Sequence, residues 1–307
     1  MIDKIKDTSV YKSLNFSKSK SHAYLLYSID KELNNQIALS FAKSLICENQ
    51  TSCNQCNACK QFNSSSHPDI TIINQTSIKV EDANKIISKL STKPISSNVK
   101  VFVILNAETI NEIAQNKLLK SLEEPSEHNI FILTSTKTDK LLPTILSRLN
   151  KQYVSKLTSN DKKILQPDLK AINVDISNYI DKDFMLTDII NFETNKDYKD
   201  TLTSIDYLFS NLKTTADIPK VVTTISSSNK SLFFPLLQDI VLDCINDSKK
   251  FDKSITMLIN VNFNKKALLK CLPLIEDAYK KQMSNVNFSY ILDNLLFNML
   301  KEKFLCK

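Results

Sequence analysis

The stretch Tyr24–Ala38, YLLYSIDKELNNQIA, decides how the first half of the chain is interpreted. It predicts a short apolar strand, a turn and the start of an amphipathic helix, because apolar residues first run together and then recur at helical spacing. In many nucleotide-binding α/β proteins a glycine-rich phosphate loop occupies such a turn. This stretch has no glycine and no lysine next to serine or threonine, so it keeps the shape of that loop without its chemistry.

Compared with the pattern G-x-x-x-x-G-K-[ST], the turn lacks every residue that phosphate binding needs. The glycines let backbone N–H groups approach phosphate, the lysine supplies a positive charge, and the hydroxyl binds magnesium. The positions of the two glycines, the lysine and the hydroxyl are taken by Ser28, Leu33, Asn34 and Asn35. Asp30 and Glu32 would also repel a triphosphate. We therefore predict an ordinary strand-to-helix turn with no bound ATP.

A second requirement of ATP hydrolysis is also missing. The strand that supports magnesium should end in an acidic pair. Here the apolar run Val101–Leu105 ends in Asn106, and Glu108 follows too late to take that place. The sequence thus predicts that this chain has no intrinsic ATPase activity.

Alternating strand and helix patterns organise the first half of the chain into an α/β domain. Short and almost wholly apolar runs predict strands that are buried on both faces. These runs are Ala23–Tyr27, Asp69–Ile73, Lys100–Leu105, Asn129–Thr134 and Gln152–Val154. Helical patterns lie between them, and one stops at Pro125, because proline ends a helix. The alternation predicts a parallel sheet with helices on both sides.

Beyond about Lys156 the strand signals disappear and helical patterns remain. We predict three domains: an α/β domain over residues 1–155, a small helical domain over residues 156–195 and an all-helical domain over residues 196–307. Long helices are expected at Leu232–Ile245 and Phe288–Phe304, and the run Ser226–Lys230 is expected to form a loop.

The composition limits the class of protein further. The chain has 307 residues, no glycine and a formal net charge of +7, and its many Lys, Asn, Ile and Ser residues fit coding DNA rich in A and T. The basic residues are dispersed, so the charge permits a nucleic-acid partner without requiring one. No apolar run approaches the ~20 residues of a membrane helix, and the N-terminus lacks the apolar core of a secretory signal. We expect a soluble, cytoplasmic protein.

Four of the seven cysteines, Cys47, Cys53, Cys56 and Cys59, fall in one short segment with the spacing C-x5-C-x2-C-x2-C. A two-residue gap lets adjacent thiolates face one ion, and four sulfurs complete a tetrahedron, so we predict a structural zinc site. An iron–sulfur cluster is an alternative, although the further C-P element is missing, and free or redox-active thiols are another. His67 follows closely and is either a replacement ligand or an ordinary loop histidine.

Ordered motifs over residues 20–150 resemble a known family. They are His22–Leu26 with the degenerate loop, Ala42–Cys47, His67–Asp69, Asn116–Pro125, Ile132–Thr136 and Leu141–Arg148. In this order and spacing they resemble the delta prime subunits of bacterial DNA polymerase III clamp loaders, which belong to the AAA+ clamp-loader family. The later domains match that family by helical pattern only.

The resemblance implies a place in a ring of subunits that uses ATP to open the sliding clamp and load it onto primed DNA. Delta prime-type members often lack the phosphate loop, so this chain would be a non-hydrolysing stator. Its partners would be the gamma/tau and delta subunits, with the sliding clamp and primer–template DNA reached through the complex, and no membrane. The small helical domain would be lid-like, and the C-terminal helices would pack into an oligomeric collar.

The resemblance also assigns a role to Ser147 and Arg148. They match the family's Ser-Arg-Cys motif, whose arginine reaches the nucleotide of the neighbouring subunit as an arginine finger in trans. Leu149 stands in place of the motif's cysteine, a change that we expect to affect packing more than the reach of the arginine.

Two other functions remain open on the sequence. One is an ATP-hydrolysing gamma/tau-like motor subunit of the same complex with an unusual loop. The other is a zinc-containing nucleic-acid-binding module, which the dispersed basic residues and the absence of tryptophan do not favour.

Overall fold

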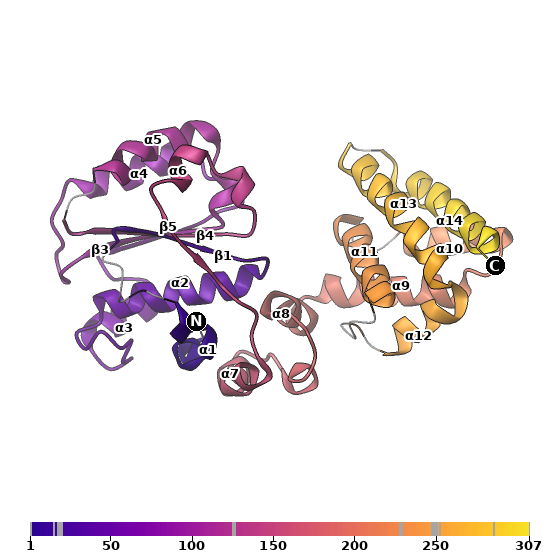
Figure 1. Cartoon of the computed structure of the whole chain (residues 1–307), viewed down its shortest axis with the longest axis horizontal. Helices are drawn as coiled ribbons and strands as arrows, with labels where there is room; N and C mark the ends of the chain where they lie inside the picture. Colours follow the sequence, from indigo (N-terminus) through magenta and orange to yellow (C-terminus); the bar gives the residue numbers. More distant parts are fainter. Residues whose placement is uncertain are drawn as a thin grey trace. The chain divides into compact units, whose positions relative to one another are not determined.

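The chain, described by a computed structural model over residues 2–14, 16, 21–124, 127–226, 230–246, 251, 253–284 and 286–306, folds into two compact units. The first unit comprises residues 1–180 and 185–187, and the second comprises residues 181–184 and 188–307. The first is a sheet flanked by helices and the second is helical (Figure 1). All the predicted strands therefore belong to the first unit.

Five parallel strands form the sheet in the order β2-β3-β4-β1-β5, so β1 lies between β4 and β5. Their bounds are β1 (Ala23–Tyr27), β2 (Ile70–Asn74), β3 (Lys100–Leu105), β4 (Asn129–Ser135) and β5 (Asn150–Tyr153). The predicted parallel sheet is confirmed. β1 and β3 agree with the prediction at both ends, whereas β2, β4 and β5 are shifted or extended slightly.

Helices cover both faces of the sheet, as predicted, with α4, α5 and α6 on one face and α1, α2 and α3 on the other (Figure 1). Their bounds are α1 (Ser9–Ser13), α2 (Lys31–Ile46), α3 (Asn57–Asn63), α4 (Val80–Leu90), α5 (Glu112–Glu123) and α6 (Pro143–Leu146). Pro125, the predicted helix stop after α5, lies outside the described residues.

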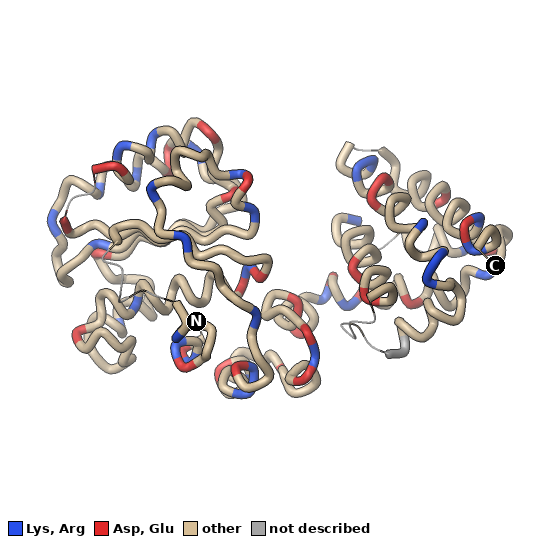
Figure 2. The backbone as a smooth tube through the Cα atoms, viewed as in Figure 1, with Lys and Arg blue, Asp and Glu red and all other residues tan. Residues whose placement is uncertain are grey.

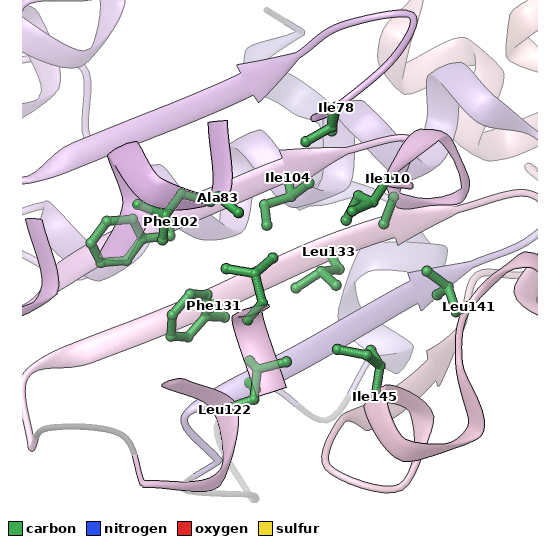
Figure 3. Packing of buried hydrophobic residues seen from close by; sticks show 14 of the residues in the cluster. Ile78, Ala83, Phe102, Ile104, Ile110, Leu122, Phe131, Leu133, Leu141 and Ile145 are labelled. Carbon is green, nitrogen blue, oxygen red and sulfur yellow. The ribbon is translucent and has the colours of Figure 1, made fainter. Parts of the chain in front are cut away.

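The core between the sheet and α4, α5 and α6 is built from strand residues that face the helices (Figure 3). Phe102 of β3 and Phe131 of β4 stack with their ring centroids 5.3 Å apart. Ala83, Leu122 and Ile145 contribute from the three helices, and all are buried. β3 is buried along its whole length, which explains why its sequence is a continuous apolar run instead of an alternating one.

The N-terminal segment and α7 complete the first unit. The 3₁₀ helix η1 (Asp3–Asp7) packs against α7 (Ser159–Ala171). Asp161 forms a capping box with Thr158 at the start of α7 and also accepts bonds from the backbone N–H and hydroxyl of Ser9. The short 3₁₀ helices of this unit are η2 (Ala107–Thr109), η3 (Thr138–Lys140) and η4 (Ser177–Tyr179).

The second unit is a helical assembly in which α13 packs against both α11 and α14. Its elements are α9 (Lys196–Asn211), η5 (Thr215–Asp217), α10 (Ile218–Ile225), α11 (Lys230–Asn246), α12 (Lys253–Asn262), α13 (Lys265–Met283) and α14 (Phe288–Leu305), and α8 (Leu186–Thr194) begins in the first unit. The two long helices expected from the sequence fall within α11 and α14. Residues 227–229 of the predicted loop before α11 lie outside the described residues.

Charged residues are distributed over both units. Figure 2 shows Lys and Arg interspersed with Asp and Glu along the described backbone, without a continuous basic tract. In the part of the chain that the structure describes, each helix is too short or too polar to cross a membrane.

Candidate functional site at the two ends of helix α2

Asn34 closes the β1–α2 turn at the position where a phosphate loop has its lysine. This side chain lies in the first turn of α2 and is 1% exposed. Its Nδ2 donates to the carbonyl oxygens of Ser28 (3.1 Å) and Ser135 (3.2 Å), and its Oδ1 accepts from Ser28 Oγ at 2.8 Å. Both N–H donors of the amide are therefore used within the protein. Asn34 ties the ends of β1 and β4 together where an ammonium would meet phosphate.

Asn35, at the position of the magnesium-binding hydroxyl, extends this network across the edge of the sheet. Its Oδ1 accepts from Thr134 Oγ1 at 2.7 Å, and Thr134 Oγ1 accepts from the N–H of Asn106 at 2.8 Å. Asn106 Nδ2 then donates to Asn74 Oδ1 at 3.2 Å. These neutral side chains link α2 and the carboxyl ends of β2, β3 and β4. No carboxylate belongs to this chain of bonds.

Glu108 lies beyond the tip of β3 and is bonded to the end of β4. Its Oε1 accepts from the Thr136 hydroxyl at 2.7 Å and from the Thr136 N–H at 3.3 Å. Ser135 Oγ accepts from the N–H of Lys137 at 3.1 Å. Thr136 and Ser135 at the end of β4 thus bond with the protein's own groups.

Asp30 occupies the anion-binding end of α2. Its carboxylate accepts from the N–H of Leu33 at 3.2 Å, from the N–H of Leu186 at 2.6 Å and from the N–H (3.1 Å) and hydroxyl (2.7 Å) of Thr187. The Thr187 hydroxyl in turn accepts from the N–H of Glu32 at 2.8 Å. Backbone N–H groups at a helix start attract anions. Here a side-chain carboxylate and a hydroxyl already hold these donors.

The environment of Asp30 explains both its position and its titration. Burial raises the pKa of Asp30, and the bonds from Thr187, Leu33 and Leu186 offset only part of that rise. The sequence contained one local signal of this role, since an aspartate just before an amphipathic helix favours an N-cap. The contact with Thr187 joins residues that are far apart in the chain, so no local pattern could reveal it.

The opposite end of α2 leads into the cysteine loop, Cys47–Cys59. Cys47 is the C-cap of α2, and Cys56 is the N-cap of α3, which places Cys59 in the first turn of that helix. The sulfur atoms of Cys47, Cys53, Cys56 and Cys59 all lie within 4.8 Å of one another. Tetrahedral zinc sites use such sets of sulfur donors. The structure therefore brings the four predicted ligands together in a group that can hold a metal ion.

Backbone N–H groups point at the sulfurs of this cluster. The N–H of Cys53 donates to Cys47 Sγ, that of Cys56 to Cys53 Sγ and that of Cys59 to Cys56 Sγ, each at 3.4 Å. The N–H of Asn54 bonds to the sulfur of Cys59. Hydrogen bonds to the charged form of a group stabilise that form. These N–H groups therefore favour the thiolate, the form that binds metal.

The thiols of the cluster differ in how easily they ionise. Burial opposes ionisation of Cys47, but the N–H groups of Cys53, Thr51 and Asn49 outweigh it and lower the pKa of Cys47 to about 6. Burial raises the pKa of Cys59 to about 12. A bound divalent cation would favour the thiolate at all four positions, so the donor set fits a metal ion.

The cysteine loop also contains unusual backbone conformations. Gln50, Ser52 and Asn54 have φ angles of 54°, 53° and 61°. This left-handed region costs an L-amino acid roughly 1–2 kcal/mol, and the chain has no glycine to relieve it. The loop therefore stores conformational strain around its sulfurs.

His67 is buried but does not belong to the sulfur cluster. Its Nδ1 accepts from the N–H of Asp69 at 3.2 Å, and the metal-ligating group found among the described residues contains the four cysteines alone. The Asp69 carboxylate accepts backbone N–H bonds that fix the loop before β3. Their donors are Ile95, Ser96 and Ser97. The His67–Asp69 motif thus supports a loop, a role that sequence reasoning missed.

Arg148 lies just after α6 and is anchored locally. Its Nη1 donates to the carbonyl of Thr144 at 2.6 Å and to Ser147 Oγ at 3.3 Å, and its Nη2 pairs with Glu123 at the end of α5. The arginine side chain is 31% exposed. Leu149 is buried in the core beside the sheet. Thr144, Ser147 and Glu123 therefore hold the guanidinium in place, and buried Leu149 anchors the backbone next to it.

These features define a class of protein: a parallel α/β domain that keeps the strand–turn–helix of a nucleotide site in closed form and carries a four-sulfur cluster. Residues 7–158, about half of the chain, match the family described as "DNA polymerase III, delta subunit". The resemblance found in the sequence motifs is thereby confirmed. The chain is a relative of DNA polymerase III clamp-loader subunits of delta prime and gamma/tau type.

Individual relatives show the same relationship over about half of the chain. The tau subunit of DNA polymerase III from Bacillus subtilis is 34% identical over 156 residues, which are 50% of this chain and 28% of that protein. The delta prime subunit from Pseudomonas aeruginosa is 30% identical over 151 residues, which are 47% of this chain and 46% of that protein. The matched part thus spans less than half the length of these curated relatives.

The fold extends the similarity along the chain. A crystal structure of a DNA polymerase III gamma subunit-related protein from Thermotoga maritima matches with a TM-score of 0.51 and covers 98% of this chain and 99% of that one. The two sequences are 15% identical, so this match concerns the fold alone.

Proposed function

We propose that this chain is a non-hydrolysing, delta prime-like stator subunit of a DNA polymerase III clamp loader, which assists ATP-dependent loading of the sliding clamp onto primed DNA. The observation that carries the proposal is the closed β1–α2 turn. The N–H groups of Glu32 and Leu33 and the amide of Asn34 are bonded within the protein. An incoming phosphate would have to break these bonds and displace the Asp30 carboxylate, which repels it.

In this proposal Arg148 acts on the nucleotide of a neighbouring subunit. It is the one arginine among the chain's 40 Lys and Arg residues, and a lysine ammonium does not offer the planar, bidentate fork of a guanidinium. Thr144 and Ser147 anchor the side chain, so little ordering would be needed at the moment of reaction. A phosphoryl group of the neighbour would take the place of Glu123 and receive the charge stabilisation of an arginine finger.

The rest of the chain would serve assembly. Residues 156–195 would form the lid-like part, and residues 196–307 would pack into the collar with gamma/tau and delta subunits. The four thiolates of the cysteine loop would hold a structural zinc ion, which would crosslink the segment after α2. Because protein sulfurs would fill all its coordination positions, such an ion has no open position for a substrate.

The experiment that tests the proposal is Arg148→Ala in a complex reconstituted with the partner subunits. The DNA-stimulated ATPase of the complex should fall by about 1,000-fold or more, the scale of an arginine finger. Lys151→Ala, which removes an exposed cation from β5, is the matched control and should leave the rate unchanged. Gel filtration would establish that both variants assemble. Normal ATPase activity in an assembled Arg148→Ala complex would contradict the proposed role.

A second measurement separates the stator from the motor alternative. The isolated chain should show no saturable, magnesium-dependent binding of ATP at micromolar concentration. Binding in this range would identify the chain as a nucleotide-binding subunit, whatever the result with Arg148.

A further inference from the structure

Lys43 is a buried cation at the base of the cysteine loop. It lies in the last turns of α2, is 0% exposed and ranks among the largest fully buried side chains of the described residues. A buried charge is costly unless hydrogen bonds and counter-charges compensate it. The function proposed above assigns no role to this lysine.

Its ammonium has acceptors from three separate segments. Lys43 Nζ donates to Asp3 Oδ1 at 3.1 Å, to Asn63 Oδ1 at 2.8 Å and to Asn54 Oδ1. These acceptors come from the N-terminal segment, the end of α3 and the middle of the cysteine loop. The three N–H donors of the ammonium are therefore all used, and Phe62 adds a ring centroid at 5.9 Å.

One of these bonds, to Asn54, leads directly to the sulfur cluster, and a backbone bond of Lys43 leads there as well. Asn54 lies between Cys53 and Cys56, and its backbone N–H bonds to the sulfur of Cys59. The carbonyl of Lys43 itself accepts from the N–H of Cys47 at 3.1 Å. Lys43 thus positions Asn54, which bonds to the sulfur of Cys59, and Lys43 itself bonds to the backbone of Cys47.

The charges around Lys43 also link it to the metal site. Only one of the three acceptors, Asp3, is a carboxylate, and its side chain is 46% exposed. The other two acceptors are neutral amides, of half-buried Asn54 and exposed Asn63, and they leave much of the positive charge of Lys43 unbalanced. A divalent ion with four thiolates carries a net negative charge. A buried ammonium close to such a centre lowers the cost of both charges.

We propose that Lys43 is the positioning residue of the metal centre: it fixes Asn54 and α3 in the arrangement that brings the four sulfurs together, and it supplies the counter-charge of the loaded site. This inference rests on the zinc site proposed above. Outer partners of metal ligands typically change metal affinity by about 10- to 100-fold. That is the effect expected when Lys43 is lost.

The test compares Lys43→Met with Lys60→Met in the full-length chain. Lys60 is exposed on α3 directly after Cys59, so its loss removes the same formal charge from the same module without removing the bonds to Asn54 and Asn63. Cobalt affinity would be measured from the thiolate-to-metal absorption band, and zinc affinity by competition with a chelator. Lys43→Met should weaken both by about 10- to 100-fold, and Lys60→Met should stay within about twofold of the wild type. Lys43→Arg should recover part of the loss.

The outcomes are distinguishable. A wild-type chain that binds neither cobalt nor zinc would overturn the metal centre itself. A wild-type chain that binds metal, together with Lys43→Met of equal affinity, would overturn the role of Lys43 alone.

If Lys43→Met does not fold, Asn54→Gly takes its place. Glycine keeps the left-handed backbone and the N–H at this position and removes the side chain that carries the acceptor oxygen. Metal affinity about tenfold below that of the wild type would support the inference, and unchanged affinity would overturn it.

Discussion

The two ends of helix α2 differ in whether their convergent polar groups are already bonded to one another. At the start of the helix, the side chains of Ser28, Asp30, Asn34 and Asn35 bond within the protein, and the Asp30 carboxylate holds the place of an anion. At the other end, four sulfurs converge under backbone N–H groups, and the loop around them is strained. The difference teaches that convergent polar groups indicate a ligand only when they are not already satisfied by one another.

The largest expected effect concerns the cysteine loop, at the C-terminal end of α2. Cys59→Ser removes one of four sulfur donors, so metal affinity should fall by more than about 100-fold, the upper range for loss of an outer partner. Chelator competition would measure it. Cys271→Ser, a buried cysteine of the second unit, is the control and should leave metal affinity as it is. Equal affinity in Cys59→Ser would show that the four sulfurs do not act as one site.

The next effect concerns the closed turn. Asn34→Leu removes the amide donor to the carbonyls of Ser28 and Ser135, and Ser135 keeps only the bond from the N–H of Ser28. The free energy of unfolding should therefore fall by about 3 kcal/mol. Metal affinity should not change, because the network lies at the other end of α2. Denaturant unfolding would measure the loss. The exposed Asn84→Leu on α4 should stay within about 0.5 kcal/mol of the wild type, and a similar small loss in Asn34→Leu would mean that the turn is not held by this amide.

A smaller effect is the opposite pH dependence of the stability that two buried carboxylates, Asp30 and Asp69, contribute. Burial raises the pKa of Asp30, so the folded chain holds this proton more tightly than the unfolded chain does. The contribution of Asp30 to stability is therefore fully present below the ordinary pKa of aspartate and is lost as pH rises through the folded-state pKa.

For Asp69, burial alone would raise the pKa, but the bonds from Ile95, Ser96 and Ser97 lower it. Its contribution is present above the ordinary pKa and is lost as pH falls through the folded-state pKa. Asp30→Asn and Asp69→Asn, unfolded by denaturant from pH 3 to pH 7, should differ from the wild type by about 1–2 kcal/mol with opposite pH slopes. Parallel slopes would contradict this assignment.

The smallest effect tests the strain in the cysteine loop. Gln50→Gly should raise the free energy of unfolding by up to about 1 kcal/mol, because glycine adopts positive φ without the steric cost. Ser65→Gly, which has φ of 55° outside the four-cysteine segment, should stabilise the fold by a similar amount. Of the two, only Gln50→Gly should change metal affinity, and it should do so by a few-fold at most. Destabilisation by Gln50→Gly would show that its side chain has a role of its own.

Much of the first unit was predictable because its strands carry strong local signals. β1 and β3 are buried on both faces, so their apolar runs marked both ends correctly. β5 (NKQY) lies at the edge of the sheet and is half exposed, and its polar sequence led the prediction to Gln152–Val154 instead. The cysteine spacing likewise predicted four donors, because neighbouring thiolates within a short loop have few other arrangements.

By itself, the sequence determined that the β1–α2 turn lacks the residues that bind phosphate and that four cysteines form one group. It also determined that the first half of the chain forms a parallel sheet. These conclusions depend on residue type and short spacing. Only the tertiary structure decided what fills the turn and what supports the cluster. Asp30 meets Thr187, Asn34 meets Ser135, and Lys43 meets Asp3 across long stretches of chain, because burial forces each polar group to find a partner wherever the fold places one.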